Sequence, residues 1–226
     1  MNVIILAGGK GERLKPLTIN VPKPMIMVKE KPILWYILRQ LKYYGINKVS
    51  LTIGYKSSII KEYFKKNFLD VEINFFNDGD VDIIERIRSV VKKSPNEDVL
   101  ILYGDTISDV KIDELLSFSL KNKNHSILTV WPLQTNFGVV ELNNKNEITA
   151  FKEKPRLDKF INIGYFVLKK DLFRYLHDFN NYGDFLTFCG KSGYLKAFVH
   201  EGEHFTVNNV VELKLAEKNL NKIKIF

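Results

Sequence analysis

The sequence is poor in cysteine and contains no long apolar run, and each absence excludes a class of protein. Cys189 is the single cysteine among 226 residues, so no internal disulfide framework can form. No apolar run is long enough to cross a lipid bilayer, and the first residues do not resemble a secretory signal. We therefore expect a protein of a reducing compartment, the cytoplasm, with no membrane among its partners.

Histidine is also scarce, and its spacing does not indicate a metal site. His200 and His204 are the closest pair, but Glu201, Gly202 and Glu203 between them are typical of a turn and not of one helix face. No Ser-His-Asp or Cys-His arrangement can be argued either. The chemistry expected of this chain therefore does not begin with a covalent nucleophile.

Basic residues outnumber acidic ones, 34 against 26, which gives a formal net charge of +8. Such a surplus raises nucleic acid as a partner, yet zinc-finger spacing, a recognition helix and a basic ribbon interleaved with aromatics are all missing. Lys214, Lys218 and Lys222 instead recur every four residues, as on the solvated face of a helix. We therefore expect no nucleic-acid partner, and the positive surplus suits a polyphosphate substrate.

The hydrophobic pattern predicts an α/β protein. Hydrophobic residues make up 45% of the chain, which is enough for a packed core in one large domain. Apolar runs alternate with segments of helical period through the first half, which favours a mostly parallel sheet with helices on both faces. The expected strands are 3–7, 49–53, 71–76 and 99–103, and the expected helices are 33–41, ended by Gly45, 57–68, capped by Ser57, and 83–91.

The second half of the sequence has a different character. Short strands are expected at 126–130, 138–142 and 161–168, joined by Asn-rich turns. They predict a smaller mixed β sheet laid over the first half. No composition break or low-complexity linker marks a second domain.

A closing helix is expected from about residue 209 to residue 221. Its apolar side chains Val211, Leu215 and Leu220 should turn inward against the rest of the chain.

Glycines interrupt the first apolar run in a way that predicts an anion-binding loop. Residues 3–7 are typical of a buried strand, and Gly8, Gly9 and Gly11 after them let the backbone approach a phosphate closely. A dinucleotide-binding fingerprint and a Walker A loop are both excluded, because the residues E-R-L-K that follow Gly11 fit neither pattern. The loop is therefore expected to bind a polyanion of another kind.

Residues 6–18 carry the pattern L-A-G-G-x-G-x-R-L-x-P-L-T, and residues 21–25 carry x-P-K-P-M. This segment resembles the signature of the sugar-1-phosphate nucleotidylyltransferases, and every fixed position of that signature is present. The resemblance implies transfer of a nucleoside monophosphate from an NTP to a sugar 1-phosphate, with pyrophosphate released. It fits a Rossmann-like three-layer α/β/α fold in a single nucleotidylyltransferase domain, residues 1–226, without the C-terminal β-helix of many relatives.

The reaction that the resemblance implies needs alignment and charge neutralisation more than a nucleophile. Arg13 after the glycine loop and Lys23 between two prolines are its catalytic cations, the first placed to stabilise the leaving pyrophosphate. The nucleotide-binding residues implied are Leu6, Ala7, Gly8, Gly9, Gly11 and Gly104.

Asp105 follows the apolar run 99–103, so its carboxylate should be paired with a cation or should hold a metal ion. The alternative is a carboxylate that caps the turn into the next segment. The resemblance implies Mg²⁺ as the cofactor and Asp105 as its ligand. Because ligands in open α/β sheets lie outside the carboxyl ends of the strands, residues 8–13 and 104–106 are expected at the same sheet edge.

Two later elements extend the resemblance to the sugar side. Residues 151–155 match F-x-E-K-P, and residues 161–164 match I-N-x-G. In the family, such elements hydrogen-bond the sugar hydroxyls, neutralise the acceptor phosphate and leave room for the ring. The sugar-phosphate-binding residues implied are Glu153, Lys154, Asn162 and Gly164, with Gly138 as a further backbone position that faces the sugar.

Two departures from the family pattern bear on metal and base. Asn208 stands where relatives carry a second metal-binding aspartate, and its amide can offer Mg²⁺ an oxygen but no charge. Residues 77–86 lack the small side chains of the stretch that reads the base in relatives. The sequence KPILWY at 31–36 resembles the glucose-1-phosphate cytidylyltransferases and slightly favours CTP, although heptose- and mannose-phosphate guanylyltransferases share much of it.

Two alternatives are open at this point. Asn208 and the altered stretch 77–86 would suit a catalytically weakened homologue that binds a nucleotide sugar as a regulator. The other alternative keeps the chemistry and changes the acceptor to a non-sugar phosphate, against which Glu153, Lys154 and Asn162 argue. The sequence does not fix the base, the sugar or the oligomeric state, for which a homo-oligomer is one option.

Overall fold

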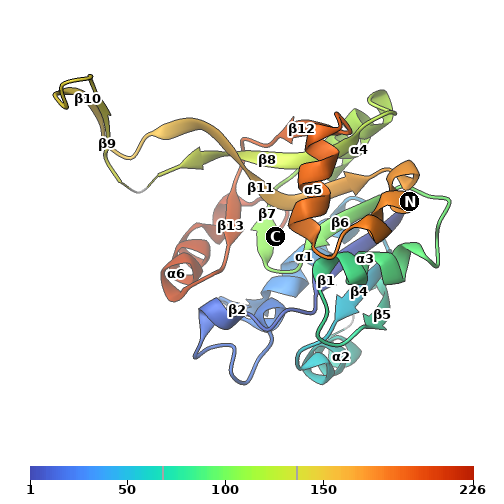
Figure 1. Cartoon of the computed structure of the whole chain (residues 1–226). Coiled ribbons are helices and arrows are strands. Elements are labelled where there is room, and N and C mark those ends of the chain that lie inside the picture. The colour runs from blue at the N-terminus through green and yellow to red at the C-terminus, as the bar shows by residue number, and fades with distance from the viewer. Residues whose placement is uncertain (68, 136) are drawn as a thin grey trace.

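The described residues form a seven-stranded sheet at the centre of the molecule (Figure 1). The structure is a computed structural model that describes residues 1–67, 69–135 and 137–226. The strand order across the sheet is β12-β8-β11-β6-β1-β4-β5. Its strands are β1 (Asn2–Ala7), β4 (Lys48–Ile53), β5 (Glu72–Asn77), β6 (Val99–Tyr103), β8 (Ser126–Gln134), β11 (Arg156–Leu168) and β12 (Leu195–Val199).

Helices cover both faces of this sheet. Side chains alternate along a strand, so Val3, Ile5 and Ala7 of β1 pack into one hydrophobic cluster and Ile4 packs into another. The first cluster includes residues of α1, α2, α4 and α6, and the second includes residues of α3 and α5. The expected three-layer α/β/α arrangement is thus confirmed. The helices are α1 (Ile33–Tyr43), α2 (Ser57–Lys66), α3 (Ile83–Val91), α4 (Ile112–Lys121), α5 (Tyr182–Lys191) and α6 (Val210–Asn219).

Two-stranded antiparallel sheets flank the central sheet. One of them, which we name the arm (residues 139–152), projects from the body at the top left of Figure 1. The pairs are β2 (Met27–Val28) with β3 (Lys31–Pro32), β7 (Thr106–Ser108) with β13 (His204–Thr206), and β9 (Val139–Leu142) with β10 (Ile148–Lys152) in the arm. Short 3-10 segments are η1 (Glu12–Leu14), η2 (Lys23–Met25), η3 (Lys170–Asp178) and η4 (Leu220–Lys222).

The first half of the chain folds as its pattern predicts. β1, β4, β5 and β6 run parallel and lie within one residue of the expected bounds. β6 lies between β1 and β11, and its residues 99–102 are buried, as the continuous apolar run indicates. Gly45 follows α1 with a φ of 76°, a left-handed conformation that glycine adopts without strain. The predicted end of this helix is therefore confirmed.

The helix expected at 57–68 differs at both ends. The residue that precedes α2 is Lys56, with a φ of 48°, and its side chain makes no capping hydrogen bond to the helix. Ser57 is the first residue inside the helix, so its prediction as the cap is wrong. α2 ends at Lys66, and Phe68 lies outside the described residues.

Of the strands expected in the second half, β9 forms a small separate sheet with β10, but that sheet is antiparallel, and β8 and β11 extend the central sheet instead of joining it. β11 pairs antiparallel with β6 and with β8, and β12 pairs parallel with β8. The reason is burial, since residues 163–168 of β11 are buried on both faces of the strand. Such a strand needs helices on both faces and strands on both edges, which only the interior of the main sheet supplies.

α6 turns a different face to the core than expected. Asn209 caps this helix, and its side-chain oxygen accepts a backbone hydrogen bond of 2.9 Å from the first turn. Ala216 and Leu220 are buried, whereas Val211 is 77% exposed and Leu215 is 53% exposed. Because residues four apart share a helix face, these are two separate faces. The inward orientation is right for Leu220 and wrong for Val211 and Leu215.

Two expectations about the cell compartment can be compared with the structure. Cys189 is a buried free thiol in α5. In the described parts of the chain, no helix is both long and apolar enough to cross a bilayer. The cytoplasmic location itself stays a prediction.

Candidate active site

The loops that follow β1 and β6 lie side by side at the carboxyl edge of the sheet. β1 and β6 are parallel neighbours, with Leu6 opposite Tyr103. The backbone N–H of Gly104 donates to the carbonyl of Leu6 at 2.9 Å and ties the two loops together. A cavity of about 460 Å³ opens at this edge. It is lined by residues 6–9, 11–14, 23, 24, 80, 81, 83, 86, 103–105 and 208.

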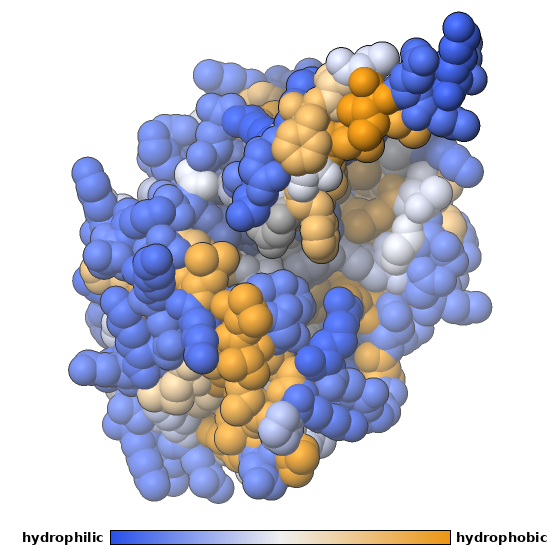
Figure 2. Space-filling model, turned by 90° about the vertical axis from the view of Figure 1, so that its left-hand side faces the viewer, coloured by the Kyte–Doolittle hydropathy of each residue, from blue (hydrophilic) through white to orange (hydrophobic). Residues whose placement is uncertain are grey.

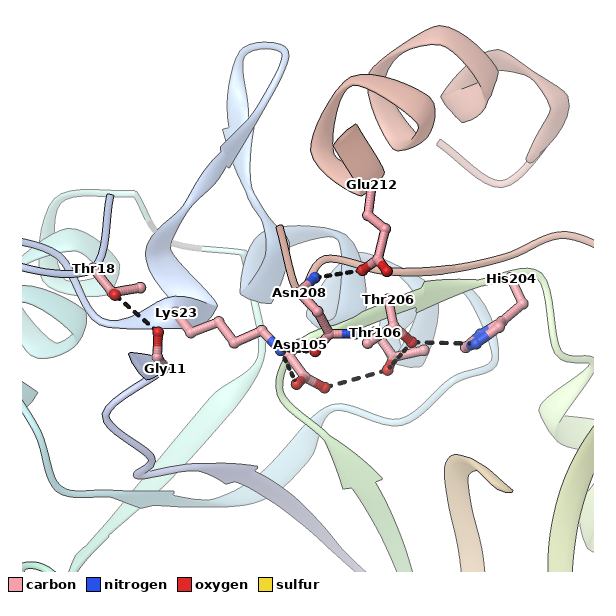
Figure 3. A network of polar contacts seen from close by, with 9 residues as sticks. All are labelled: Gly11, Thr18, Lys23, Asp105, Thr106, His204, Thr206, Asn208 and Glu212. Carbon is pink, nitrogen blue, oxygen red and sulfur yellow. Dashed lines mark hydrogen bonds and ion pairs between the residues drawn. The ribbon is translucent and has the colours of Figure 1, made fainter. Parts of the chain in front are cut away.

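All the residues predicted to bind the nucleotide line this cavity. Gly11 has a φ of 63°, and a Cβ built on it would lie 2.9 Å from the Lys23 Cβ, so only glycine fits there without strain. The Thr18 hydroxyl donates to the Gly11 carbonyl at 2.9 Å and holds this turn (Figure 3). No heavy atom lies within 4 Å of a Cβ built on Gly9, among the described residues. The loop is therefore fixed at Gly11 and open at Gly9, where a phosphate has space.

Lys23 reaches across the cavity from η2, between Pro22 and Pro24. Its ammonium forms an ion pair with the Asp105 carboxylate and donates to the Asn208 side-chain oxygen at 2.9 Å (Figure 3). Pro22 has a φ of −67° just before η2, and the two prolines restrict the backbone from which the lysine extends. Asp105 and Asn208, which are far apart in the sequence, thus both contact the Lys23 ammonium.

Asp105 lies at the start of a chain of side-chain hydrogen bonds (Figure 3). Its second carboxylate oxygen accepts from the Thr106 hydroxyl at 3.3 Å, and the hydroxyls of Thr106 and Thr206 are 3.3 Å apart. The Thr206 hydroxyl lies 3.2 Å from Nε2 of His204. These hydrogen bonds are consistent with one direction of donation: the His204 N–H donates to the Thr206 hydroxyl, this hydroxyl donates to that of Thr106, and the Thr106 hydroxyl donates to the carboxylate. Burial lowers the pKa of His204 to about 4, so this ring is neutral near pH 7.

Asn208 is held by its backbone as well as by its side chain. Its N–H donates to the Glu212 carboxylate at 2.7 Å, and the N–H of Val207 donates to the Asp105 carbonyl at 3.4 Å. These bonds fix the segment before α6 against the loop after β6. The Asn208 side-chain oxygen therefore faces the same point as the Asp105 carboxylate.

The Asp105 carboxylate and the Asn208 carbonyl are the donor types that Mg²⁺ prefers, and both oxygens face the Lys23 ammonium, which stands in for a cation between them. In the described part of the chain, no group of three or more His, Cys, Asp or Glu side chains could hold a metal ion. A metal here would therefore take its other ligands from water and from substrate phosphates, as Mg²⁺ commonly does. The residues fit such an ion, with one charged ligand from the protein.

Arg13 lies in η1, directly after the glycine loop, and lines the same cavity. Its side chain is exposed, unlike the partly buried Lys23. A guanidinium at the rim can bind two phosphate oxygens at once. The sequence-predicted pair of cations therefore borders one cavity, and their catalytic roles stay predictions.

Arg86 is a residue of the cavity wall that the sequence analysis did not single out. It lies in α3, is 3% exposed, and donates to the carbonyl of Ile53 at 3.0 Å. It also donates to the carbonyls of Gly8 at 3.3 Å and Gly79 at 2.7 Å. The signal was its position, since Arg86 lies three residues after Ile83 and four before Val90, a spacing that puts it next to the apolar face of the helix.

Two of the predicted sugar-side residues adjoin the cavity through Tyr103. The Asn162 amide donates to the Tyr103 hydroxyl at 3.1 Å and accepts from the Gly164 N–H at 2.8 Å. Gly164 has a φ of 81°, and a Cβ built on it would lie 2.5 Å from the Tyr103 ring. Because Tyr103 lines the cavity, the structure brings Asn162 and Gly164 to its border.

Gly138, Glu153 and Lys154 lie at the base of the arm and are not among the described residues that line the cavity. A Cβ built on Gly138 would lie 2.6 Å from the Phe151 ring and 3.2 Å from the Glu153 carboxylate. Lys154 is exposed, with a φ of 44°, an uncommon conformation for a residue with a side chain. Gly138 and Glu153 therefore lie close together, and the Lys154 ammonium is 3.9 Å from the Glu153 carboxylate, outside the set of residues that line the cavity.

Figure 2 turns the left-hand side of Figure 1 toward the viewer and shows this face hollowed near its middle, with apolar side chains gathered above the hollow. The arm projects on this side (Figure 1), and its exposed apolar residues are Val140, Leu142, Ile148 and Phe151. Apolar side chains therefore lie above the hollow, and Figure 2 shows a second apolar patch, flanked by polar side chains, below it.

Comparisons with known proteins agree with this arrangement. The sequence profile of a family described as "Nucleotidyl transferase" matches residues 2–202. A protein of Bacillus subtilis (strain 168) named "Probable glucose-1-phosphate cytidylyltransferase" is 31% identical over 248 residues, which cover 98% of this chain and 97% of the relative. The "D-glycero-alpha-D-manno-heptose 1-phosphate guanylyltransferase" of Campylobacter jejuni is 34% identical over 179 residues, which cover 76% of this chain and 78% of the relative.

A solved structure described as UDP-glucose pyrophosphorylase complexed with UDP-glucose has the same fold. Its TM-score is 0.76, and the match covers 98% of each chain at 19% sequence identity. At that identity the likeness concerns the fold alone.

Proposed function

The chain belongs to the sugar-1-phosphate nucleotidyltransferase family, and from that premise we propose that it transfers a nucleoside monophosphate from an NTP to a sugar 1-phosphate. The proposed preferred NTP is CTP, from which CMP is transferred, and the proposed cofactor is Mg²⁺. The products are a nucleoside diphosphate sugar and pyrophosphate. A phosphate oxygen of the acceptor forms a bond to the α-phosphorus of the NTP, and the bond from that phosphorus to the bridging β-oxygen breaks.

One observation carries this proposal. Lys23, Asp105 and Asn208 meet at the cavity that the glycine loop borders, although they come from three separate parts of the chain. Phosphoryl transfer is catalysed mainly by alignment and by neutralisation of charge, and this cavity offers a backbone loop, cations and a carboxylate. Such a reaction does not require a covalent nucleophile from the protein.

Each residue has a role that its position supports. The open backbone of the glycine loop would receive the triphosphate, and Arg13 at the rim would stabilise the leaving pyrophosphate. Lys23 would neutralise the α-phosphate region as the new bond forms. Asp105, with Asn208, would hold Mg²⁺, which when bound neutralises phosphate charge and keeps the reacting groups aligned.

The acceptor would lie between the cavity and the arm. Asn162 and Gly164 border the cavity through Tyr103 and would contact the sugar ring. Gly138 and Glu153 would contact sugar from the base of the arm, and the exposed Lys154 ammonium would neutralise the acceptor phosphate.

The preference for CTP rests on sequence likeness. The relative named as a cytidylyltransferase matches 98% of this chain, whereas the relative named as a guanylyltransferase matches 76%. Asp80, Val81, Ile83 and Arg86 line the cavity beside the glycine loop, and the ribose and base would lie against them.

A panel of four NTPs against several sugar 1-phosphates tests the proposal, with Mg²⁺ present and pyrophosphate release as the readout. We expect turnover with CTP and a hexose 1-phosphate, and slower turnover with other bases. Turnover with a different base would correct the proposed nucleotide and keep the reaction. Tight binding of a nucleotide sugar without turnover of any pair would overturn the enzymatic function.

A further inference from the structure

Arg86 is a buried cation whose neighbouring carboxylates have other partners. Burial lowers the pKa of its guanidinium, and the charges of Asp78, Asp80 and Asp82 oppose that change. Asp78 accepts from the Ser89 hydroxyl at 3.0 Å, Asp80 pairs with Lys10, and Asp82 caps α3. A buried charge without an ion-pair partner is costly unless its donors are hydrogen-bonded. The contacts that Arg86 does make are therefore informative.

The guanidinium of Arg86 joins the ends of three neighbouring strands. Its acceptors are the carbonyls of Gly8 after β1, Ile53 at the end of β4, and Gly79 after β5. One nitrogen, Nη2, donates to both Gly8 and Gly79. This nitrogen thus connects the phosphate-binding loop directly to the segment after β5.

Glycines leave the space that this guanidinium occupies. A Cβ built on Gly8 would lie 2.1 Å from Nη1 of Arg86, a separation at which atoms overlap. A Cβ built on Gly54 would lie 2.7 Å from the Gly79 carbonyl oxygen and 3.1 Å from Nη2 of Arg86. The two glycines and the arginine are therefore one packed unit, independent of the hydrogen bonds themselves.

The segment that Arg86 holds forms the part of the cavity wall beside the glycine loop, to which the Lys10–Asp80 ion pair also joins it. Asp80, Val81 and Ile83 line the cavity, and we name residues 78–83 the base-side segment because, on the proposed function, the base would lie against those three side chains. Residues that discriminate between bases must stand at a fixed distance from the phosphates, since displacements of about 1 Å are enough to lose specific contacts.

We propose that Arg86 is a positioning residue that determines base specificity, by holding the base-side segment at a fixed distance from the phosphate-binding loop. This inference rests on the proposed function, because it concerns the nucleotide that the same cavity binds. Arg86 acts through Gly8 and Gly79, whose carbonyls it holds, and needs no contact with the base.

Two substitutions at Arg86 and one matched control test this inference. Arg86→Met removes the charge and the donors at similar length, and Arg86→Lys keeps the charge without the planar fork. Arg88→Met is the control, since Arg88 lies on the same helix and its Nε donates to the Leu176 carbonyl at 2.9 Å. Arg88 is not among the described residues that line the cavity.

The readout is the ratio of kcat/KM between the best and the second-best NTP, with the thermal midpoint of each variant measured alongside. We expect Arg86→Met to lower this ratio about tenfold, mainly through KM, and Arg86→Lys to lower it by a smaller factor. Arg88→Met should lower the thermal midpoint and leave the ratio within about twofold of its original value. If Arg86→Met does not fold, Arg86→Lys carries the test.

An equal loss of kcat/KM for every NTP in both Arg86 variants would overturn the inference, because a purely structural role predicts that result. Calorimetric binding of the four NTPs separates this failure from failure of the proposed function. If the original protein binds NTPs selectively but releases no pyrophosphate, only the proposed enzymatic function is contradicted. The proposed role of Arg86 then still predicts that Arg86→Met binds the four NTPs less selectively. Binding selectivity unchanged in that variant would contradict the inference by itself.

Discussion

The edge of the cavity that carries Lys23, Asp105 and Asn208, here called the rim, and the arm carry the residues proposed to bind the two substrates. The two regions are built in different ways. At the rim, Lys23, Asp105 and Asn208 are joined by an ion pair and hydrogen bonds, and Arg86 ties the glycine loop to the segment after β5. The arm is a two-stranded ribbon in which Phe151 is 64% exposed. Two strands alone are marginally stable, so the arm depends on few contacts. On the proposed function, the nucleotide would bind in a cavity whose side chains already contact one another, whereas the acceptor would also contact exposed side chains at the base of the arm.

The largest effect is expected at the centre of the rim. Lys23→Met should lower kcat by a factor of about 10² to 10³, because a fixed positive charge at the reacting phosphate is lost. The KM for the sugar phosphate should change much less. Steady-state kinetics on both substrates measure this split, and Lys111→Met, at an exposed lysine just before α4, serves as the control.

The same Lys23→Met variant has a second readout that does not depend on turnover. The ammonium lies between the Asp105 carboxylate and the Asn208 oxygen, so its removal should strengthen Mn²⁺ binding in the absence of nucleotide. Paramagnetic resonance of free Mn²⁺ measures this affinity. Unchanged kcat and unchanged Mn²⁺ affinity would together remove Lys23 from its role.

Stability should differ sharply between the two regions. Ile101→Ala in β6 leaves a cavity at a fully buried site and should lower the free energy of unfolding by about 2–5 kcal/mol. Phe151→Ala in the arm should change that free energy by no more than about 0.5 kcal/mol. Denaturant unfolding of both variants provides the comparison. A similar loss in the two would show that the arm packs against the body, and the contrast drawn above would be wrong.

The acceptor side can be separated from the nucleotide side at Lys154. Lys154→Met should raise the KM for the sugar 1-phosphate about tenfold, which is the size of one lost charge-assisted hydrogen bond. The KM for the NTP should stay the same. Lys145→Met, in the turn of the arm, is the control. Equal changes in both KM values would place Lys154 with the nucleotide instead.

The smallest effect is expected at the metal position. Asn208→Asp adds a second negative ligand beside Asp105 and should lower the Mg²⁺ concentration for half-maximal activity about five- to tenfold. Titration of activity with Mg²⁺ at a fixed NTP concentration measures it. An unchanged requirement for Mg²⁺ would mean that position 208 does not contact the ion.

The rim could be predicted from sequence because local patterns and one topological rule suffice. Residues 99–103 are apolar at every position, which predicts a strand buried on both faces. The strand-end rule then puts Asp105 beside the glycine loop, and the structure brings Asp105 to Lys23. These inferences need only the pattern of hydrophobic residues along the chain and the direction of the strands.

Other features could not be predicted, for different physical reasons. α6 carries apolar residues on more than one face, so its pattern does not select Ala216 over Leu215 for the core. The pairing partner of β11 depends on contacts distant in sequence, and local alternation does not encode it. Arg86 is charged, and the usual expectation for arginine is a surface position, so its burial required the three acceptors that the structure supplies.

We propose that the two loops, which are distant in sequence, surround a bound triphosphate and that the carboxylate of Asp105 holds the metal ion there. Binding of Mn²⁺ in the presence of a non-hydrolysable NTP, followed by paramagnetic resonance in the original chain and in Asp105→Asn, tests it most directly. The account predicts a ternary complex whose Mn²⁺ affinity falls at least about tenfold in Asp105→Asn. Equal Mn²⁺ affinity in the two proteins would contradict it.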